Sequence, residues 1–198
     1  MKKIVIASNN PGKLKELKAL LDPLGFEAIP QSEFRIAEAE EPHDTFLENA
    51  LAKARHASRA TGLAALADDS GLCVPSLGGE PGVHSAHYAG REGAREDRDA
   101  RNNAKLVAAL QDRDDRAAFY YCVLVLTRSA IDPTPLVAEG RWHGTIALEP
   151  RGTNGFGYDP YFVPRAASRT AAEMPPEEKN RVSHRARALE SLAHLLEG

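Results

Sequence analysis

Asp68 and Asp69 are adjacent carboxylates that follow the apolar run 63–67 and precede Ser70-Gly71. The run predicts a short strand, and the carboxylates are expected in a polar turn at its end. Two neighbouring aspartates can repel each other into unequal pKa values, or can together hold a divalent cation. An Asx turn is the ordinary structural alternative. Glu40 and Glu41 strengthen the case for a cation site if they face the same cleft.

A second polar turn follows the apolar run 4–7, and its residues are Ser8, Asn9, Asn10, Pro11, Gly12 and Lys13. The turn opens a predicted helix, so it offers backbone N–H groups at a helix N-terminus together with one ammonium, which are the groups that hold a phosphate. The Walker pattern GxxxxGK[ST] is absent. Taken alone, such a turn is more often an ordinary helix cap.

Two aromatic residues alternate with glycines in the segment Asn154-Gly155-Phe156-Gly157-Tyr158-Asp159-Pro160. A planar base could stack on such aromatic rings, and Asp159 could accept hydrogen bonds from ring N–H groups. A hairpin corner with core aromatics is an equally good interpretation. Lys179, His184 and Arg185 further along the chain are donors suited to a phosphate or a base carbonyl, with surface solvation as the alternative.

The elements that must position these residues are both helices and strands. Thr45 followed by Glu48 predicts an N-cap for a helix that runs to about Gly62. The β-rich segments 116–127 and 136–148 predict a long antiparallel hairpin, whereas the charged run 91–101 is expected to be a solvated face. These elements predict an α/β fold of α+β character, with an elongated mixed sheet, flanking helices and two lobes around a central cleft.

Composition excludes several classes of protein. The 198 residues are enough for one domain over 1–198, and 42% hydrophobic and 27% charged residues are typical of a globular chain. A net charge of −3 provides no field for non-specific DNA binding. No apolar run reaches the length of a membrane span, and no CxxC, metal-like histidine spacing or GxSxG elbow is present, with His84 and His87 as a weak exception. A cytoplasmic protein is expected.

Six motifs occur in an order and spacing that resemble the inosine/xanthosine triphosphate pyrophosphatases. They are Ser8-Asn9-Asn10-Pro11-Gly12-Lys13, Thr45-Phe46-Leu47-Glu48-Asn49-Ala50, Ala67-Asp68-Asp69-Ser70-Gly71-Leu72, Pro81-Gly82-Val83, Phe156-Gly157-Tyr158-Asp159-Pro160 and Ser183-His184-Arg185. The resemblance covers essentially the whole chain.

The resemblance implies a Mg²⁺-dependent, cytoplasmic homodimer that hydrolyses dITP, ITP and XTP to the nucleoside monophosphate and pyrophosphate. It implies that Asp69 is the proton acceptor and a magnesium ligand, with a second carboxylate from Glu40 or Glu41. The substrate contacts that it implies are Ser8 to Lys13, Lys53, Ser70, Phe156, Gly157, Tyr158, Asp159, Lys179, His184 and Arg185. The chain departs from the family pattern at His84 and His87, where a tyrosine and an arginine are usual.

A mechanism follows as a hypothesis: magnesium polarises the phosphate chain, while Asp69 or Asp68 orients a water toward the α-phosphorus. His184 and Arg185 could favour a 6-oxo purine over adenine. Three alternatives stay open, namely a nucleotide-binding regulator without turnover, a nucleic-acid-binding module, and a pyrophosphatase for modified pyrimidine nucleotides.

Overall fold

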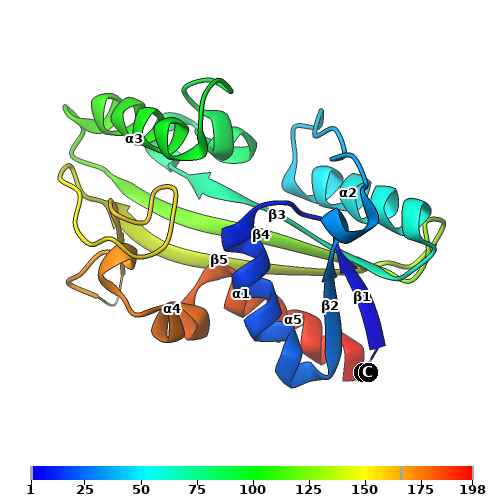
Figure 1. Ribbon diagram of the computed structural model, residues 1–198. Coiled ribbons are helices and arrows are strands. Elements are labelled where there is room, and N and C mark those ends of the chain that lie inside the picture. The colour runs from blue at the N-terminus through cyan, green and yellow to red at the C-terminus, as the bar shows by residue number, and fades with distance from the viewer. Residues whose placement is uncertain (1, 166, 198) are drawn as a thin grey trace. The chain divides into compact units, whose positions relative to one another are not determined.

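The computed structural model describes residues 2–165 and 167–197, so both ends of the expected domain 1–198 lie outside the described residues. The fold is mixed α/β and contains a six-stranded sheet in the order β2-β1-β3-β4-β5-β6 (Figure 1). β1 pairs in parallel with β2 and β3, whereas β5 and β6 are antiparallel. The prediction of a mixed sheet with helices is therefore confirmed.

The strands are β1 (Lys2–Ile6), β2 (Phe26–Pro30), β3 (Ala65–Cys73), β4 (Ala117–Thr127), β5 (Leu136–Ile146) and β6 (Phe162–Pro164). The α-helices are α1 (Pro11–Leu21), α2 (Phe46–Thr61), α3 (Arg95–Leu110), α4 (Pro176–Val182) and α5 (His184–Glu197). Short 3-10 helices cover Asp22–Leu24, Gln31–Phe34, Pro75–Leu77, Gly82–His87 and Ala171–Glu173. Among the described helices, none is long and apolar enough to cross a membrane.

The chain divides into two compact units. The first unit contains residues 1–69, 122–140 and 184–198, and the second contains residues 70–121 and 141–183. The boundaries fall inside β3, β4 and β5. A single domain with two lobes around a cleft therefore stays a prediction.

The first unit is held together by an apolar core between strands and helices. α1 and α5 lie side by side (Figure 1), and the leucines Leu17, Leu21, Leu189 and Leu192 pack with strand residues such as Ile4. Figure 1 places α2 on the other side of these strands. α2 buries small residues at helical spacing, Ala50, Ala54 and Ala57, which allows a close approach to β1.

The second unit has its own core of aromatic and aliphatic side chains. The Phe162 ring lies 4.8 Å from the Tyr120 ring and 5.2 Å from the Trp142 ring, measured between centroids. Leu106 and Leu110 belong to the same core and attach the C-terminal half of α3 to it. Such aromatic contacts fix ring orientation as well as burying area.

One local prediction is wrong. β3 does not end before Asp68-Asp69 in a polar turn but continues through both carboxylates to Cys73, because lysine and arginine side chains neutralise the buried acids. The charged run 91–101 is a solvated face as predicted, since each of its residues is exposed or half-buried, and α3 begins within it at Arg95. The other elements agree closely: Thr45 caps α2, and β4 and β5 are neighbours joined by the loop 128–135 (Figure 1).

Candidate functional site

The two aspartates of β3 are held by different helices. Asp68 is 1% exposed and receives Lys13 Nζ of α1 at 2.6 Å and Arg185 Nε of α5 at 2.7 Å. Asp69 is 6% exposed and receives Lys53 Nζ of α2 at 2.8 Å. Successive side chains of a strand point to opposite faces, and the helices that bind the pair lie on opposite sides of β3. The adjacent carboxylates therefore belong to two different clusters.

Lys53 connects Asp69 to an acidic residue that precedes α2. Its ammonium lies 2.6 Å from Glu41 Oε1 and 2.9 Å from the Asp68 carbonyl oxygen, in addition to its contact with Asp69. Burial opposes the charge of Lys53, yet the carboxylates of Asp69 and Glu41 raise its pKa overall. Glu41 is thus the glutamate that shares a cation with Asp69, and like Glu40 it is exposed.

The two carboxylate oxygens of Asp69 differ in their contacts, because Lys53 binds only Oδ1. Its Oδ2 is buried and has no hydrogen-bond partner among residues 2–165 and 167–197. Burial raises the pKa of this carboxyl, and the nearby charges of Lys53 and Lys13 work against that rise. A buried oxygen without a partner is costly, which makes it a position where a ligand is expected.

The donors of this cluster suit a hard divalent cation. Magnesium is commonly held by one or two carboxylates while phosphate oxygens and waters complete its coordination, and Asp69 and Glu41 would supply such a pair. In the described part of the chain, no group of three or more His, Cys, Asp or Glu side chains could hold a metal by itself. The residues present therefore fit a metal that is bound jointly with a phosphorylated substrate.

The turn before α1 is already capped by its own side chains. Asn10 Oδ1 accepts from the Gly12 amide at 3.0 Å and from the Lys13 amide at 3.2 Å, and Ser8 Oγ accepts from the Asn10 amide at 3.2 Å. The helix-cap interpretation of this turn is therefore confirmed. A phosphate would have to exchange with Asn10 or bind the remaining groups of the turn.

Arg185 is buried at the start of α5. Its Nε binds Asp68, its Nη1 pairs with Glu16 of α1, and the residue is 2% exposed. His184 is 3% exposed, and Gly140 of β5 approaches it so closely that a Cβ there would lie 2.0 Å from the His184 carbonyl oxygen. Ion pairs and close packing thus fix this end of α5 against the strands of the first unit.

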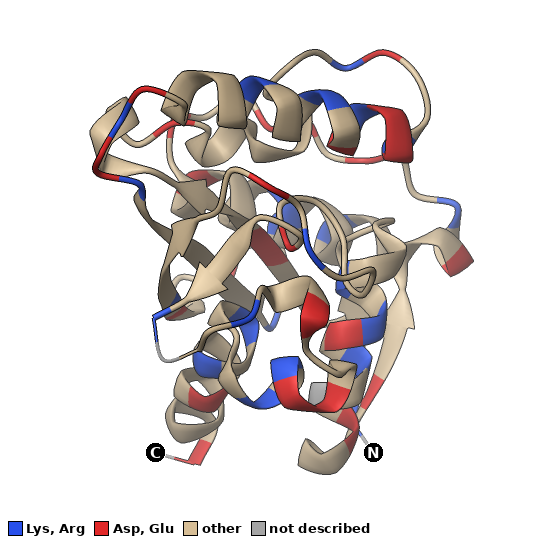
Figure 2. Ribbon diagram, turned by 90° about the vertical axis from the view of Figure 1, so that its left-hand side faces the viewer, with Lys and Arg blue, Asp and Glu red and all other residues tan. Residues whose placement is uncertain are grey.

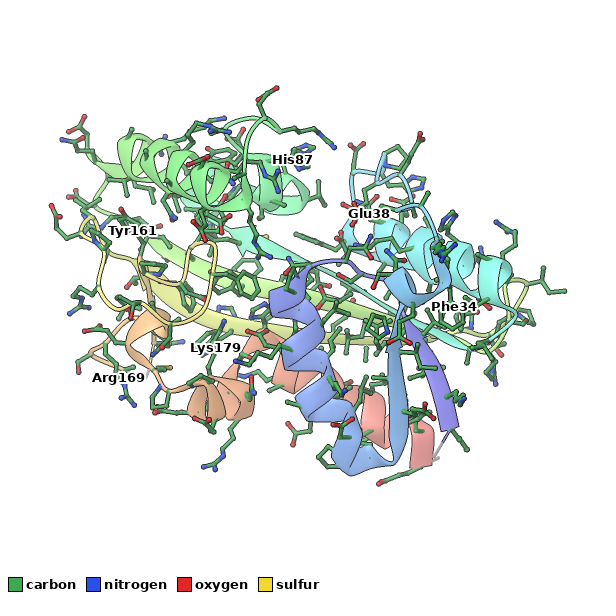
Figure 3. All side chains as sticks on the ribbon, in the orientation of Figure 1. Phe34, Glu38, His87, Tyr161, Arg169 and Lys179 are labelled. Atoms are coloured by element: carbon green, nitrogen blue, oxygen red, sulfur yellow. The ribbon has the colours of Figure 1, made fainter. Side chains whose placement is uncertain are left out.

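The second unit contains the aromatic turn. Asp159 Oδ2 accepts from Lys179 Nζ at 2.8 Å and from the Phe156 amide at 2.9 Å, while Oδ1 accepts from Tyr120 Oη at 3.2 Å. Both carboxylate oxygens therefore hold the turn itself, and Lys179, which Figure 3 labels on α4, is 5% exposed. Ser70, also in this unit, is half-buried in β3.

Three residues of α3 contact the aromatic turn, and sequence analysis missed them. The Arg95 guanidinium lies 4.7 Å from the centroid of the half-buried Phe156 ring. Asp99 Oδ2 accepts from the Gly157 amide at 3.1 Å, and Asn103 Nδ2 donates to the Gly157 carbonyl at 2.9 Å. The available signal was the spacing of four residues between Arg95, Asp99 and Asn103, which places them on one face of a helix.

The two unusual histidines lie in the 3-10 helix Gly82–His87. Their ring centroids are 5.5 Å apart, and Arg91 Nη2 lies 3.2 Å from His87 Nε2. An arginine is therefore close to the position where the resemblance expected one, although it comes from four residues later in the chain.

The site residues fall into two groups, one in each unit. The first unit carries Ser8 to Lys13, Glu40, Glu41, Lys53, Asp69, His184 and Arg185, and the second unit carries Ser70, Phe156 to Asp159 and Lys179. A comparison of the sequence with known families identifies the family to which these motifs belong. The profile of the Ham1 family matches residues 4–195. The chain belongs to the Ham1 family.

Similar proteins cover nearly the whole Ham1 chain. A dITP/XTP pyrophosphatase of Burkholderia pseudomallei (strain K96243) is 62% identical over 190 residues, which are 96% of this chain and 91% of the relative. A dITP/XTP pyrophosphatase of Ralstonia nicotianae is 59% identical over 196 residues, covering 99% and 97% of the two chains.

Solved Ham1 structures have the same fold. The structure of a HAM1 protein from Coxiella burnetii superimposes with a TM-score of 0.90 at 49% identity and covers 100% of this chain and 99% of that one. The Staphylococcus aureus Ham1 protein gives a TM-score of 0.86 at 39% identity, with the same coverage. The predicted resemblance is thereby confirmed at the level of family and fold.

Proposed function

We propose that this Ham1 chain is a dITP/XTP pyrophosphatase that removes aberrant purine nucleotides from the precursor pool. Water cleaves the bond between the α- and β-phosphates of dITP, ITP or XTP, and the products are the nucleoside monophosphate, pyrophosphate and a proton. The observation that carries this proposal is the 62% identity over 190 residues with a protein of that name. The buried Asp69 cluster supports it from the chain's own chemistry.

Asp69 is proposed as the general base. Its Oδ2 is the atom without a protein partner, so it can accept the proton of the attacking water while Lys53 holds Oδ1 in place. Lys53 and Lys13 supply positive charge in the same unit. The four negative charges of a nucleoside triphosphate need such local neutralisation, because the whole chain has a net charge of −3.

Magnesium is the proposed cofactor, held by Asp69 and Glu41 rather than Glu40. When bound, it would neutralise phosphate charge and polarise the bond that breaks. The remaining proposed substrate contacts are Phe156, Gly157, Tyr158 and Asp159 for the purine, and Ser8, Asn9, Asn10, Pro11, Gly12, Lys13, Ser70, Lys179, His184 and Arg185 for further parts of the substrate. A 6-oxo group would accept hydrogen bonds from His184 and Arg185, which adenine's amino group cannot.

The family resemblance also suggests a cytoplasmic homodimer, with one domain over 1–198 and two lobes around a cleft. These points remain predictions. Sedimentation of the purified chain would decide the oligomeric state.

The test is pyrophosphate release across a nucleotide panel, with magnesium and with excess EDTA. We expect rapid release from dITP, ITP and XTP, slow release from dATP and dGTP, and none without a divalent cation. Binding of dITP without release would instead identify a nucleotide-binding regulator. Faster hydrolysis of a modified pyrimidine triphosphate than of dITP would identify a pyrimidine pyrophosphatase.

A further inference from the structure

The face of α3 that carries Arg95, Asp99 and Asn103 contacts the aromatic turn at Phe156-Gly157. These residues are four apart, so they form one stripe along the helix, which we call the α3 stripe. All five residues belong to the second unit. Each member of the stripe reaches a different part of the turn.

Two side chains of the α3 stripe hold the backbone of the turn at Gly157. Gly157 has a φ of +64°, in the left-handed region, and its amide and carbonyl are bound by two side chains of the stripe. The carboxylate of Asp99 accepts from the amide, which is a charge-assisted bond, and the amide group of Asn103 donates to the carbonyl. Both hydrogen-bonding groups of one residue are thus held by one helix.

The stripe also contacts the ring that precedes Gly157. The Arg95 guanidinium lies 4.7 Å from the Phe156 centroid, within the range of a cation–π interaction, and Asp99 lies 3.8 Å from Arg95 Nε. Asp99 therefore links the ring contact to the backbone contact. Asn103 is 7% exposed, so its position depends on packing and not on solvent.

We propose that the α3 stripe positions the purine-stacking turn, and that Arg95, Asp99 and Asn103 set the affinity for the base while taking no part in phosphate chemistry. This inference rests on the proposed function, in which Phe156 stacks on the purine. A ring in the wrong orientation offers a poorer stacking surface but leaves Asp69, Lys53 and Glu41 unchanged. The consequence is a separable effect on base binding.

The decisive variants are Asp99→Ala and Asp99→Asn. Alanine removes the acceptor for the Gly157 amide, whereas asparagine keeps a side-chain oxygen of the same length. We expect Asp99→Ala to raise KM for dITP about tenfold, the size of effect typical of a lost charge-assisted hydrogen bond, with kcat within about twofold of wild type. Asp99→Asn should restore most of the affinity. Asp97→Ala is the matched control, since it removes an exposed aspartate from the same helix.

Inhibition by fragments of the substrate gives a second measurement that a general loss of folding would not reproduce. Deoxyinosine should inhibit Asp99→Ala more weakly than wild type, while inorganic pyrophosphate should inhibit both equally. Where wild type hydrolyses dITP, the inference is overturned if Asp99→Ala has an unchanged KM, or if its loss of activity lies in kcat and not in KM. Absence of pyrophosphate release from wild type would instead overturn the proposed function. Arg95→Ala and Asn103→Ala repeat the test should Asp99→Ala fold poorly.

Discussion

At the residue scale, the most informative feature is the different surroundings of two consecutive aspartates. Asp68 is enclosed by Lys13 and Arg185, whereas Asp69 shares Lys53 with Glu41 and has a buried oxygen without a protein partner. A carboxylate whose oxygens are bound by cations stabilises structure, while one with an available oxygen can accept a proton or a metal. The geometry therefore favours Asp69 over Asp68 as the general base.

Substitution of Asp69 by asparagine should separate chemistry from binding. We expect Asp69→Asn to lower kcat by about 10²–10⁴-fold, the usual contribution of a general base, while KM for dITP changes little. Steady-state pyrophosphate release measures both constants. Asp112→Asn, at an exposed position, is the control and should behave as wild type. Full turnover by Asp69→Asn would refute the assignment of the base.

Removal of the Phe156 ring should give the opposite pattern. Phe156→Ala loses the surface proposed for stacking, so KM for dITP should rise by about 5–100-fold at nearly constant kcat, consistent with roughly 1–3 kcal/mol for a base–aromatic stack. Phe156→Tyr keeps the ring and should retain the affinity. An unchanged KM for the alanine variant would mean that the base does not stack on this residue.

At the scale of elements, Thr45 caps the N-terminus of α2, the helix that carries Lys53. Thr45 Oγ1 accepts from the Glu48 amide at 3.2 Å and donates to Glu48 Oε2 at 2.6 Å. We expect Thr45→Ala to destabilise the protein by about 1 kcal/mol, the typical value of a lost N-cap, and to lower Tm by roughly 2–4 °C. Thermal unfolding followed by circular dichroism measures the change. Thr45→Ser should stay at the wild-type Tm, and an equal loss for serine would argue against capping.

The loop between β4 and β5 should make stability sensitive to acid. Asp132 accepts from the Arg128 guanidinium at 2.8 Å and from the backbone amides of Arg128 and Thr134 at 3.0 Å, and these bonds lower the pKa of its carboxyl well below the ordinary range. Because the pKa is lower in the folded state, this contribution is complete above the unfolded pKa of about 4 and is lost as pH falls below it.

Comparison of wild type with Asp132→Ala tests that linkage. The variant should have a lower Tm by a few degrees at pH 7, and the difference should shrink as pH falls from 5 to 3. Asp112→Ala, which lacks such bonds in the described structure, should show a small difference at every pH. A gap between wild type and Asp132→Ala that stays constant down to pH 3 would show that the carboxylate charge is not responsible.

At the scale of the whole molecule, the distribution of charge argues against a nucleic-acid-binding module. Figure 2 shows acidic and basic residues interspersed along the ribbon, and the net charge is −3. Affinity for DNA depends mainly on neutralising phosphates with clustered basic residues. We expect no measurable binding of a labelled 20-mer oligonucleotide at physiological salt by fluorescence anisotropy, under conditions in which dITP binds. Tight, salt-sensitive binding would restore that alternative.

The sequence by itself determined the family, because the six short motifs can be identified by their order and spacing without coordinates. It also predicted the Thr45 cap and the adjacent β4 and β5 strands, since these depend on residues close together in the chain. Local interactions decide such features, so local patterns are sufficient to find them.

Tertiary structure alone decided which side chains meet. The continuation of β3 through Asp68-Asp69 depends on cations from α1, α2 and α5, and the choice of Glu41 over Glu40 depends on the reach of Lys53. The contact of the α3 stripe with Gly157 joins residues more than fifty positions apart. A strand with buried carboxylates is stable only when basic side chains from distant parts of the chain neutralise them. No local pattern in the sequence contains that information.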